Sequence, residues 1–217
     1  MPDDNSYWYY EKERLKKSIT WIYLGTITAL AALCIAAYAT SSVFFKDGII
    51  SIAVVSIIYL FRDKLIYSWQ GALLASIGWL MNMSGTLGAY ELQVFGLGWD
   101  KLLHFTSMLG ITLLTYAYLR HHGLHDASLL KIGVIVFLMA QGFGAINEVA
   151  EFIGSEYFGV GQGLFGMMNG MSEPVTNLDI YDTHWDMVMN TLAIMAGLLY
   201  IAVKRRTAVP TAAPAEI

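Results

Sequence analysis

Long apolar stretches, separated by short polar segments, limit the folds that this chain can adopt. Six of them lie at residues 18–39, 47–61, 70–90, 99–119, 129–153 and 183–203. A helix needs about 20 apolar residues to cross roughly 30 Å of hydrocarbon, where every backbone polar group must be satisfied within the segment. With 56% hydrophobic and 14% charged residues, the chain also lacks the surface of a soluble protein. We therefore predict an all-α fold, a polytopic transmembrane bundle of about six helices.

The basic residues predict how these helices are oriented in the membrane. Of the thirteen Lys and Arg residues, all but Lys46 and Lys101 fall on one side of a six-helix topology. Cytoplasmic loops retain Lys and Arg, so both termini are expected in the cytoplasm, with the chain in the inner or plasma membrane of the cell. The segment 47–61 is short enough that a re-entrant segment is an alternative there.

The same pattern divides the chain into three parts. Residues 1–17 form the expected cytoplasmic N-terminal segment, residues 18–203 the transmembrane domain, and residues 204–217 a disordered cytoplasmic tail. The net charge of −4 includes no long basic run, so we expect membrane lipids and no nucleic acid as partners. The single cysteine, Cys34, lies among apolar neighbours and is expected to pack as a small apolar residue.

Polar residues gather at the expected outer ends of the last three helices. They are Asp100, Lys101 and His104, then Asn147, Glu148 and Glu151, then Asp182, His184, Asp186 and Asn190. Residues three or four apart share a helix face, so each helix presents a polar stripe. A charged residue costs roughly 2.5 to 3.5 kcal/mol at the bilayer centre, and such residues usually face inward and pair. Their excess negative charge requires protons, a metal ion or a cationic ligand.

These residues are candidate ligands and catalytic groups. For a divalent metal ion we expect ligands among Asp100, His104, Glu148, Glu151, Asp182, His184 and Asp186, and for catalysis Glu148, Glu151, His104 and Lys101. Helix capping is an alternative for Asp100 and Asp182, as is ion pairing of Lys101 with Glu151 or Asp186. For His104 the alternative is a buried histidine whose hydrogen bonds are all made within the protein. For Glu148 and Glu151 we favour a functional role, because both lie at the negative end of their helix, where a carboxylate is unfavourable.

Two further segments stand out in the sequence. His121, His122 and His125 cluster near a cytoplasmic loop, but they lack companion ligands at a recognisable spacing, which argues against a metal site. The segment Gly161 to Met171 is rich in Gly and Met and follows the two glutamates on the outer side. We expect either a lid in the membrane interface or a mobile loop there.

Three motifs in this order resemble the YjdF-like family of inner-membrane proteins, a relative of the VanZ-like proteins. They are Trp99-Asp100-Lys101-Leu102-Leu103-His104-Phe105, Asn147-Glu148-Val149-Ala150-Glu151-Phe152 and Tyr181-Asp182-Thr183-His184-Trp185-Asp186-Met187. The resemblance covers about residues 99–197, within a core expected at about 99–203. Tyr181 and His184 stand where the family often has Trp and Gln. The relation to VanZ-like proteins implies a role in the cell envelope and its lipids, by analogy.

Three functions are consistent with this pattern. The first is an enzyme or lipid-handling protein that holds a lipid headgroup, or a lipid-linked phosphate, through a divalent metal and Lys101. The second is a proton-coupled transporter that uses Glu148, Glu151 and His104, although helices one to three offer few polar partners apart from Asn82. The third is a non-catalytic scaffold, in which the polar stripes only hold the helices together.

Overall fold

The computed structural model describes residues 4–40, 42, 45–124, 126–158, 160–161, 168–169 and 177–207. Its helices are α1 (Asp4–Ala39), α2 (Phe45–Leu60), the single turn α3 (Arg62–Leu65), α4 (Trp69–Gly85), the 3₁₀ turn η1 (Ala89–Glu91), α5 (Trp99–His121), α6 (Leu129–Phe158) and α7 (Asn177–Thr207). Two short antiparallel pairs join β1 (Gln93–Val94) to β2 (Leu97–Gly98) and β3 (Val160–Gly161) to β4 (Met168–Asn169). The prediction of an all-α helical bundle is confirmed.

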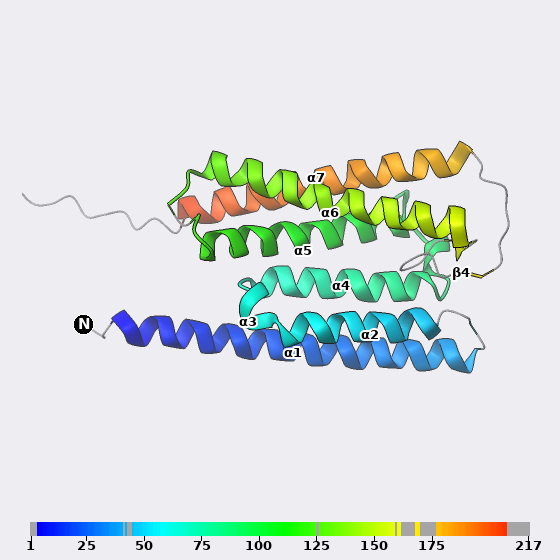
Figure 1. Ribbon diagram of the computed structural model, residues 1–217, viewed down its shortest axis with the longest axis horizontal. Coiled ribbons are helices and arrows are strands. Elements are labelled where there is room, and N and C mark those ends of the chain that lie inside the picture. Colours follow the sequence, from blue (N-terminus) through cyan, green and yellow to red (C-terminus); the bar gives the residue numbers. More distant parts are fainter. Residues whose placement is uncertain are drawn as a thin grey trace, which may run out of the picture.

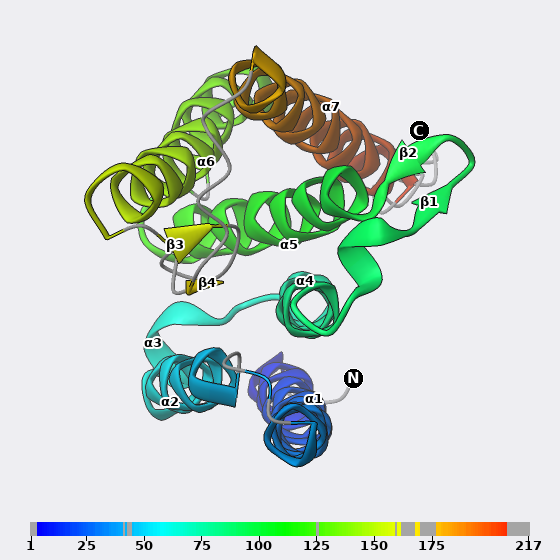
Figure 2. The same ribbon diagram turned by 90° about the vertical axis from the view of Figure 1, so that its right-hand side faces the viewer.

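The long helices form two groups that meet along α4 and α5. Figure 1 shows them side by side and nearly parallel to the long axis of the molecule. Viewed from the end in Figure 2, α5, α6 and α7 form a three-sided group, and α4 lies between α5 and the pair α1 and α2. Because successive long helices run in opposite directions, the C-terminal ends of α4 and α6 lie at the same end of the bundle as the N-terminal ends of α5 and α7.

Several helix ends differ from the predicted ones. α1 begins at Asp4, inside the expected polar segment, and α7 begins at Asn177, before its apolar stretch. The helix expected at 70–90 ends at Gly85. The hydroxyl of Ser84 turns back to the carbonyl of Met81, and Gly88 has a φ of 110°, which an L-residue rarely adopts. A side-chain hydrogen bond and a glycine in the left-handed conformation therefore end α4 inside an apolar run, and hydropathy alone does not show this end.

The outer surface of the bundle is apolar, as a lipid solvent requires. Within the described ranges, four helical segments are long and apolar enough to cross a membrane, namely Glu13–Ala39, Trp99–His121, Leu129–Ile153 and Asp182–Arg206. α2 and α4 have 16 and 17 residues, so they extend about 24 to 26 Å at 1.5 Å per residue. They also expose large apolar side chains, such as Ile57, Leu60 and Ile77. The membrane character of the bundle is thus shown, while six crossings and their orientation stay predictions.

Each group of helices has its own apolar core. Leu30, Val55 and Met83 lie in the core between α1, α2 and α4, while Met108 and Ile194 lie in the core between α5, α6 and α7. The two groups approach closely where α4 packs on α5. A Cβ atom on Gly110 would lie 2.6 Å from the backbone nitrogen of Ala75, so this contact requires a residue without a side chain.

Candidate functional site

Lys101, in the first turn of α5, contacts three aspartates, of which Asp182 and Asp186 join it to α7. Its Nζ donates to Oδ1 of Asp186 at 2.7 Å, to Oδ2 of Asp100 at 3.1 Å and to Oδ1 of Asp182. Asp186 is only 1% exposed, so this ammonium is the partner that makes its burial tolerable. The expected pairing of Lys101 with Asp186 is therefore present.

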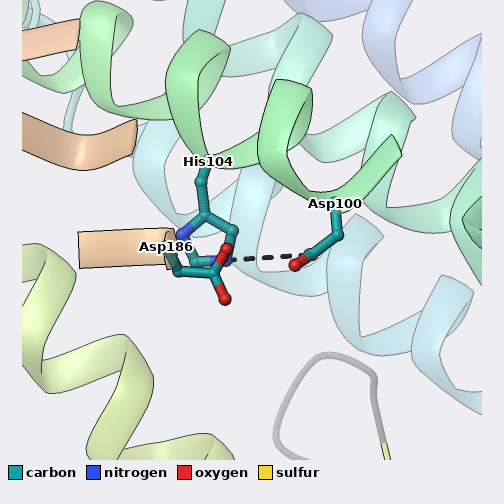
Figure 3. A group of neighbouring side chains, drawn as sticks. All are labelled: Asp100, His104 and Asp186. Atoms are coloured by element: carbon teal, nitrogen blue, oxygen red, sulfur yellow. Dashed lines mark ion pairs between the residues drawn. The ribbon is translucent and has the colours of Figure 1, made fainter. Parts of the chain in front are cut away.

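His104 lies one helical turn beyond Asp100, and its two ring nitrogens face different groups. Nε2 lies 3.7 Å from Oδ1 of Asp100 and 3.8 Å from Oδ1 of Asp186, and Figure 3 shows the three side chains converging. Nδ1 lies 3.3 Å from Oδ1 of Asn190, which accepts if Nδ1 carries the proton. That hydrogen bond fixes the ring and leaves the Nε2 lone pair directed at the two aspartates.

The two glutamates of α6 lie on the other side of the imidazole. Oε1 of Glu148 is 3.7 Å from Nδ1 of His104 and has no hydrogen-bond partner among the residues that the structure describes, although Glu148 is only 7% exposed. Oε1 of Glu151 accepts a hydrogen bond of 2.8 Å from Nδ2 of Asn147, one turn earlier in α6. Glu148 and Glu151 thus share a helix face directed at His104, as their spacing predicts.

Two overlapping sets of potential metal ligands result within the described residues. Asp100, His104 and Asp186 form one set, and His104, Glu148 and Glu151 form the other. Within each set, one ligand atom per residue lies within 4.8 Å of the others. His104 is therefore the centre of the polar cluster that the sequence predicted from three separate helices.

The remaining expected ligands have different surroundings. Asp182 bonds to Lys101 and belongs to neither set. His184 is exposed and also lies outside both sets. Capping as an explanation for Asp182 is wrong, because α7 begins at Asn177, more than one turn earlier. Asp100 lies in the first turn of α5, whose N-cap is Gly98, so it fills no N-cap position either.

The other segments that the sequence singled out have local contacts. His121 stacks on the ring of Tyr67 with centroids 3.9 Å apart, and Nε2 of His122 lies 3.1 Å from the hydroxyl of the same tyrosine. His125 lies outside the described residues. So does most of the Gly-rich and Met-rich segment, of which only Gly161, Met168 and Asn169 are described, in β3 and β4.

A cleft between α4, α5 and α6 opens onto the cluster. Its volume is about 260 Å³. The polar side chains that line it are Asn82, Tyr90, Asp100, His104, Ser107, Asn147, Glu151 and Asn190, and the apolar ones include Ala75, Leu103, Met108, Ile111 and Phe143. Asp100, His104 and Glu151 belong both to the cluster and to the cleft wall, so these three potential ligands are accessible from the cleft, whereas Asp186 and Glu148 lie behind its wall.

Sequence reasoning missed Tyr90, which forms part of the polar wall of this cleft. Its hydroxyl donates to Oδ1 of Asn82 at 2.9 Å. Burial, assisted by the carboxylates of Asp100 and Glu151, raises the pKa of Tyr90 above its usual value, so the hydroxyl stays a neutral donor. A tyrosine after a helix-ending glycine gave no signal, since its position depends on how the chain turns between α4 and α5.

Asp47, in the first turn of α2, was also missed. It is 1% exposed, and neither carboxylate oxygen has a hydrogen-bond partner among the described residues. In the same part of the chain, Oγ of Ser51, one turn later, is likewise buried without a partner. An acidic residue at the start of an apolar run was the available signal, but hydropathy placed it at a helix end, where water normally solvates such a group.

Comparison with known proteins identifies the family of the chain. A family model described as "Predicted membrane protein (DUF2238)" matches residues 19–206. No curated protein and no solved structure matches the chain. The relation to VanZ-like proteins is not part of this match and stays a prediction. Because the family model covers most of the chain, including the polar cluster, the chain belongs to the YjdF-like family of predicted membrane proteins, DUF2238.

Proposed function

We propose that this membrane protein binds a divalent metal ion between Asp100, His104 and Asp186 and uses it, with Lys101, to hold the anionic headgroup of an envelope lipid. The observation that carries the proposal is the orientation of His104, whose Nε2 faces two aspartate oxygens at 3.7 and 3.8 Å while its Nδ1 lies in hydrogen-bonding range of Asn190. Metal-binding histidines usually donate their second ring N–H to such a partner.

The distances favour a shared ion over direct hydrogen bonds. At 3.7 to 3.8 Å the nitrogen and the oxygens are too far apart for hydrogen bonds. Ligand atoms bonded to one ion at about 2.1 Å lie roughly 3.0 to 3.4 Å apart in octahedral or tetrahedral geometry. A shift of a few tenths of an ångström would therefore bring each of these aspartate oxygens to coordination spacing from the His104 nitrogen, and the three ligand atoms already lie within 4.8 Å of one another.

Charge balance supports the same set of ligands. Lys101 contacts the carboxylates of Asp100, Asp182 and Asp186 but neutralises only one negative charge. A divalent ion would offset the remaining two charges, which the apolar membrane environment otherwise penalises. One nitrogen and two carboxylate ligands suit Mn²⁺, Fe²⁺ or Zn²⁺, and they leave coordination positions for a phosphate oxygen.

The other set, around Glu148 and Glu151, is less suited to a metal. The His104 nitrogen that faces Glu148 is the one that also faces Asn190. In our proposal Glu148 does not bind the ion, and its carboxylate stabilises the orientation of the imidazole from the Nδ1 side. A role of Glu148, Glu151, His104 and Lys101 in catalysis stays a prediction.

Metal binding is tested with detergent-purified protein and Mn²⁺, whose electron paramagnetic resonance signal is lost on coordination. The wild-type chain should bind one ion, and Asp100→Asn should weaken binding by roughly tenfold or more, since even loss of an outer partner of a metal ligand typically costs that much. Glu151→Gln is the matched control and should bind as the wild type does. Absence of bound Mn²⁺, Fe²⁺ and Zn²⁺ from the wild-type chain, or unchanged affinity in Asp100→Asn, would refute the proposal.

The buried carboxylate of Asp47 supports a second candidate function, that of a proton-coupled carrier. Asp47 adds a buried carboxylate, without hydrogen-bond partners in the described part of the chain, to the first three helices, which hold few other polar groups. In proteoliposomes with an imposed pH gradient, a carrier would move protons in the wild-type chain and fail to do so in Asp47→Asn. Equal proton leak in both, and in empty liposomes, would exclude this function.

A further inference from the structure

We infer that the cleft between α4 and α6 binds one hydrocarbon chain of a phosphate-bearing membrane lipid, which enters sideways from the bilayer and places its phosphate at the polar cluster. This inference rests on the proposed metal site for the phosphate and on the cleft alone for the chain. It specifies the class of ligand, an amphiphile with an anionic head and an apolar tail.

The lining of the cleft changes from polar to apolar along α5. Asp100 and His104 line its outer end, and Met108 and Ile111 line its inner end. From Asp100 to Ile111 the helix rises about 16 Å, at 1.5 Å per residue. On α4 the lining changes in the same direction, from Asn82 near the helix end to Ala75 deeper in the bundle. A ligand that fills the cleft therefore meets hydrogen-bonding groups at one end and hydrocarbon at the other.

The size of the cleft suits part of a chain. Its volume is about 260 Å³. A dry apolar cavity of about 150 Å³ in another protein takes up benzene. The cleft thus has room for a segment of an acyl or prenyl chain, and it is too small for a whole two-chain lipid.

The cleft reaches the lipid-facing surface of the bundle. Phe143 of α6 lines it and is nevertheless 50% exposed, so its ring lies at the edge of the opening. Ile77 of α4 and Ile146 of α6, the sequence neighbours of the lining residues Gly78 and Asn147, are also exposed. In the end view of Figure 2, α4 and α6 both lie against α5 without lying against each other. Because both helices expose apolar side chains and Phe143 lies at the edge of the cleft, a lipid chain can enter from the bilayer without crossing water.

The outer end of the cleft supplies what a phosphate requires. Asp100 and His104, the proposed metal ligands, lie there together with the amides of Asn82 and Asn147. The neutral hydroxyl of Tyr90 lies on the same wall and is held by Asn82. Without a metal ion this acidic end would repel a phosphate, so the inference predicts that metal and headgroup bind together.

The test measures retention of dodecyl phosphate by native mass spectrometry after elution from detergent that contains it. With Mn²⁺ present, the wild-type chain should retain one molecule. Ala75→Leu fills the inner end of the cleft and should lower the occupancy roughly tenfold, as overpacking does. Ala32→Leu makes the same change on the exposed face of α1 and should leave retention unchanged. Ile111→Phe, also at the inner end, replaces Ala75→Leu should that variant fail to fold.

The outcomes separate this inference from the proposed metal site. Mn²⁺ binding should be the same in Ala75→Leu as in the wild type, because the substitution lies far from the ligands. If Mn²⁺ binds but dodecyl phosphate is retained no better than inorganic phosphate, or equally by Ala75→Leu, the inference about the cleft is wrong and the metal site stands. If Mn²⁺ does not bind yet Ala75→Leu still expels dodecyl phosphate, the metal site and the placement of the phosphate at it are wrong, and only the cleft as the site of the hydrocarbon chain stands.

Discussion

Lys101 is the cation that joins α5 to α7 by ion pairs, and its removal gives the sharpest test of the polar cluster. In Lys101→Met, an apolar side chain of similar length replaces the ammonium. Asp186, nearly inaccessible to solvent, then loses a hydrogen-bonded partner at 2.7 Å. Asp182 is much more exposed, so water compensates for most of what it loses.

The magnitude follows from the contact with Asp186. Two unit charges 2.7 Å apart attract by about 6 kcal/mol at an effective dielectric constant of about 20. Desolvation of both groups opposes this attraction, and removing one partner of a buried pair typically costs 3 to 5 kcal/mol, approximately. We expect Lys101→Met to lower the free energy of unfolding by about 3 kcal/mol. The double variant Lys101→Met with Asp186→Asn should be more stable than Lys101→Met, by about 1 to 2 kcal/mol, because no buried charge is left unpaired.

The assay is equilibrium unfolding in mixed micelles of dodecyl maltoside and sodium dodecyl sulfate, followed by circular dichroism. The wild type, both single variants and the double variant form a thermodynamic cycle, and its coupling energy isolates the ion pair. Lys16→Met serves as a control, since Lys16 pairs only with Glu13 at 3.5 Å on the exposed surface of α1 among the contacts described. A coupling energy near zero, or equal stability of Lys101→Met and Lys16→Met, would refute the assignment of Lys101 as the link between α5 and α7.

Three further predictions test other parts of the structure. Asp47→Ala should raise the free energy of unfolding by about 1 to 2 kcal/mol, measured in the same assay, because it removes two buried oxygens without partners; a loss of stability would show that Asp47 is paired. Gly110→Ala should lower the melting temperature through a clash with α4, whereas Gly142→Ala, where a Cβ atom meets nothing within 4 Å, should leave it equal or higher; equal effects would contradict the close packing. With cysteines introduced into a cysteine-free chain, an impermeant maleimide added to intact cells should label Phe95→Cys and spare Lys131→Cys, and the reverse would overturn the proposed orientation.

The helical architecture was predictable from the sequence because lipid imposes the same requirement on every segment. Each crossing must satisfy its own backbone hydrogen bonds, so hydropathy alone locates the helices. The helix ends were less predictable. α4 ends at Gly85, inside an apolar run, since the turn there depends on Gly88 and on hydroxyls that bond to nearby carbonyls.

The candidate site was predictable in its members and only partly in its contacts. Spacing showed that Asp100 and His104, and likewise Glu148 and Glu151, share a helix face, because the period of a helix is the same wherever it occurs. Spacing carries no information on how one helix is rotated or shifted against another. The pairing of Lys101 with Asp186 and its separation from Glu151 follow from that placement.

The sequence by itself thus determined that this chain is a membrane-embedded helical bundle whose costly polar residues lie at one end of its last three helices. Only the tertiary structure decided that His104 is their centre, that Asp47 is buried without hydrogen-bond partners among the described residues, and that a cleft with a polar and an apolar end opens beside the cluster. The physical reason is that helix contacts such as that of Gly110 with α4 set the register between helices. That register depends on side chains distant in the sequence, whereas the helices and their faces depend on local periodicity.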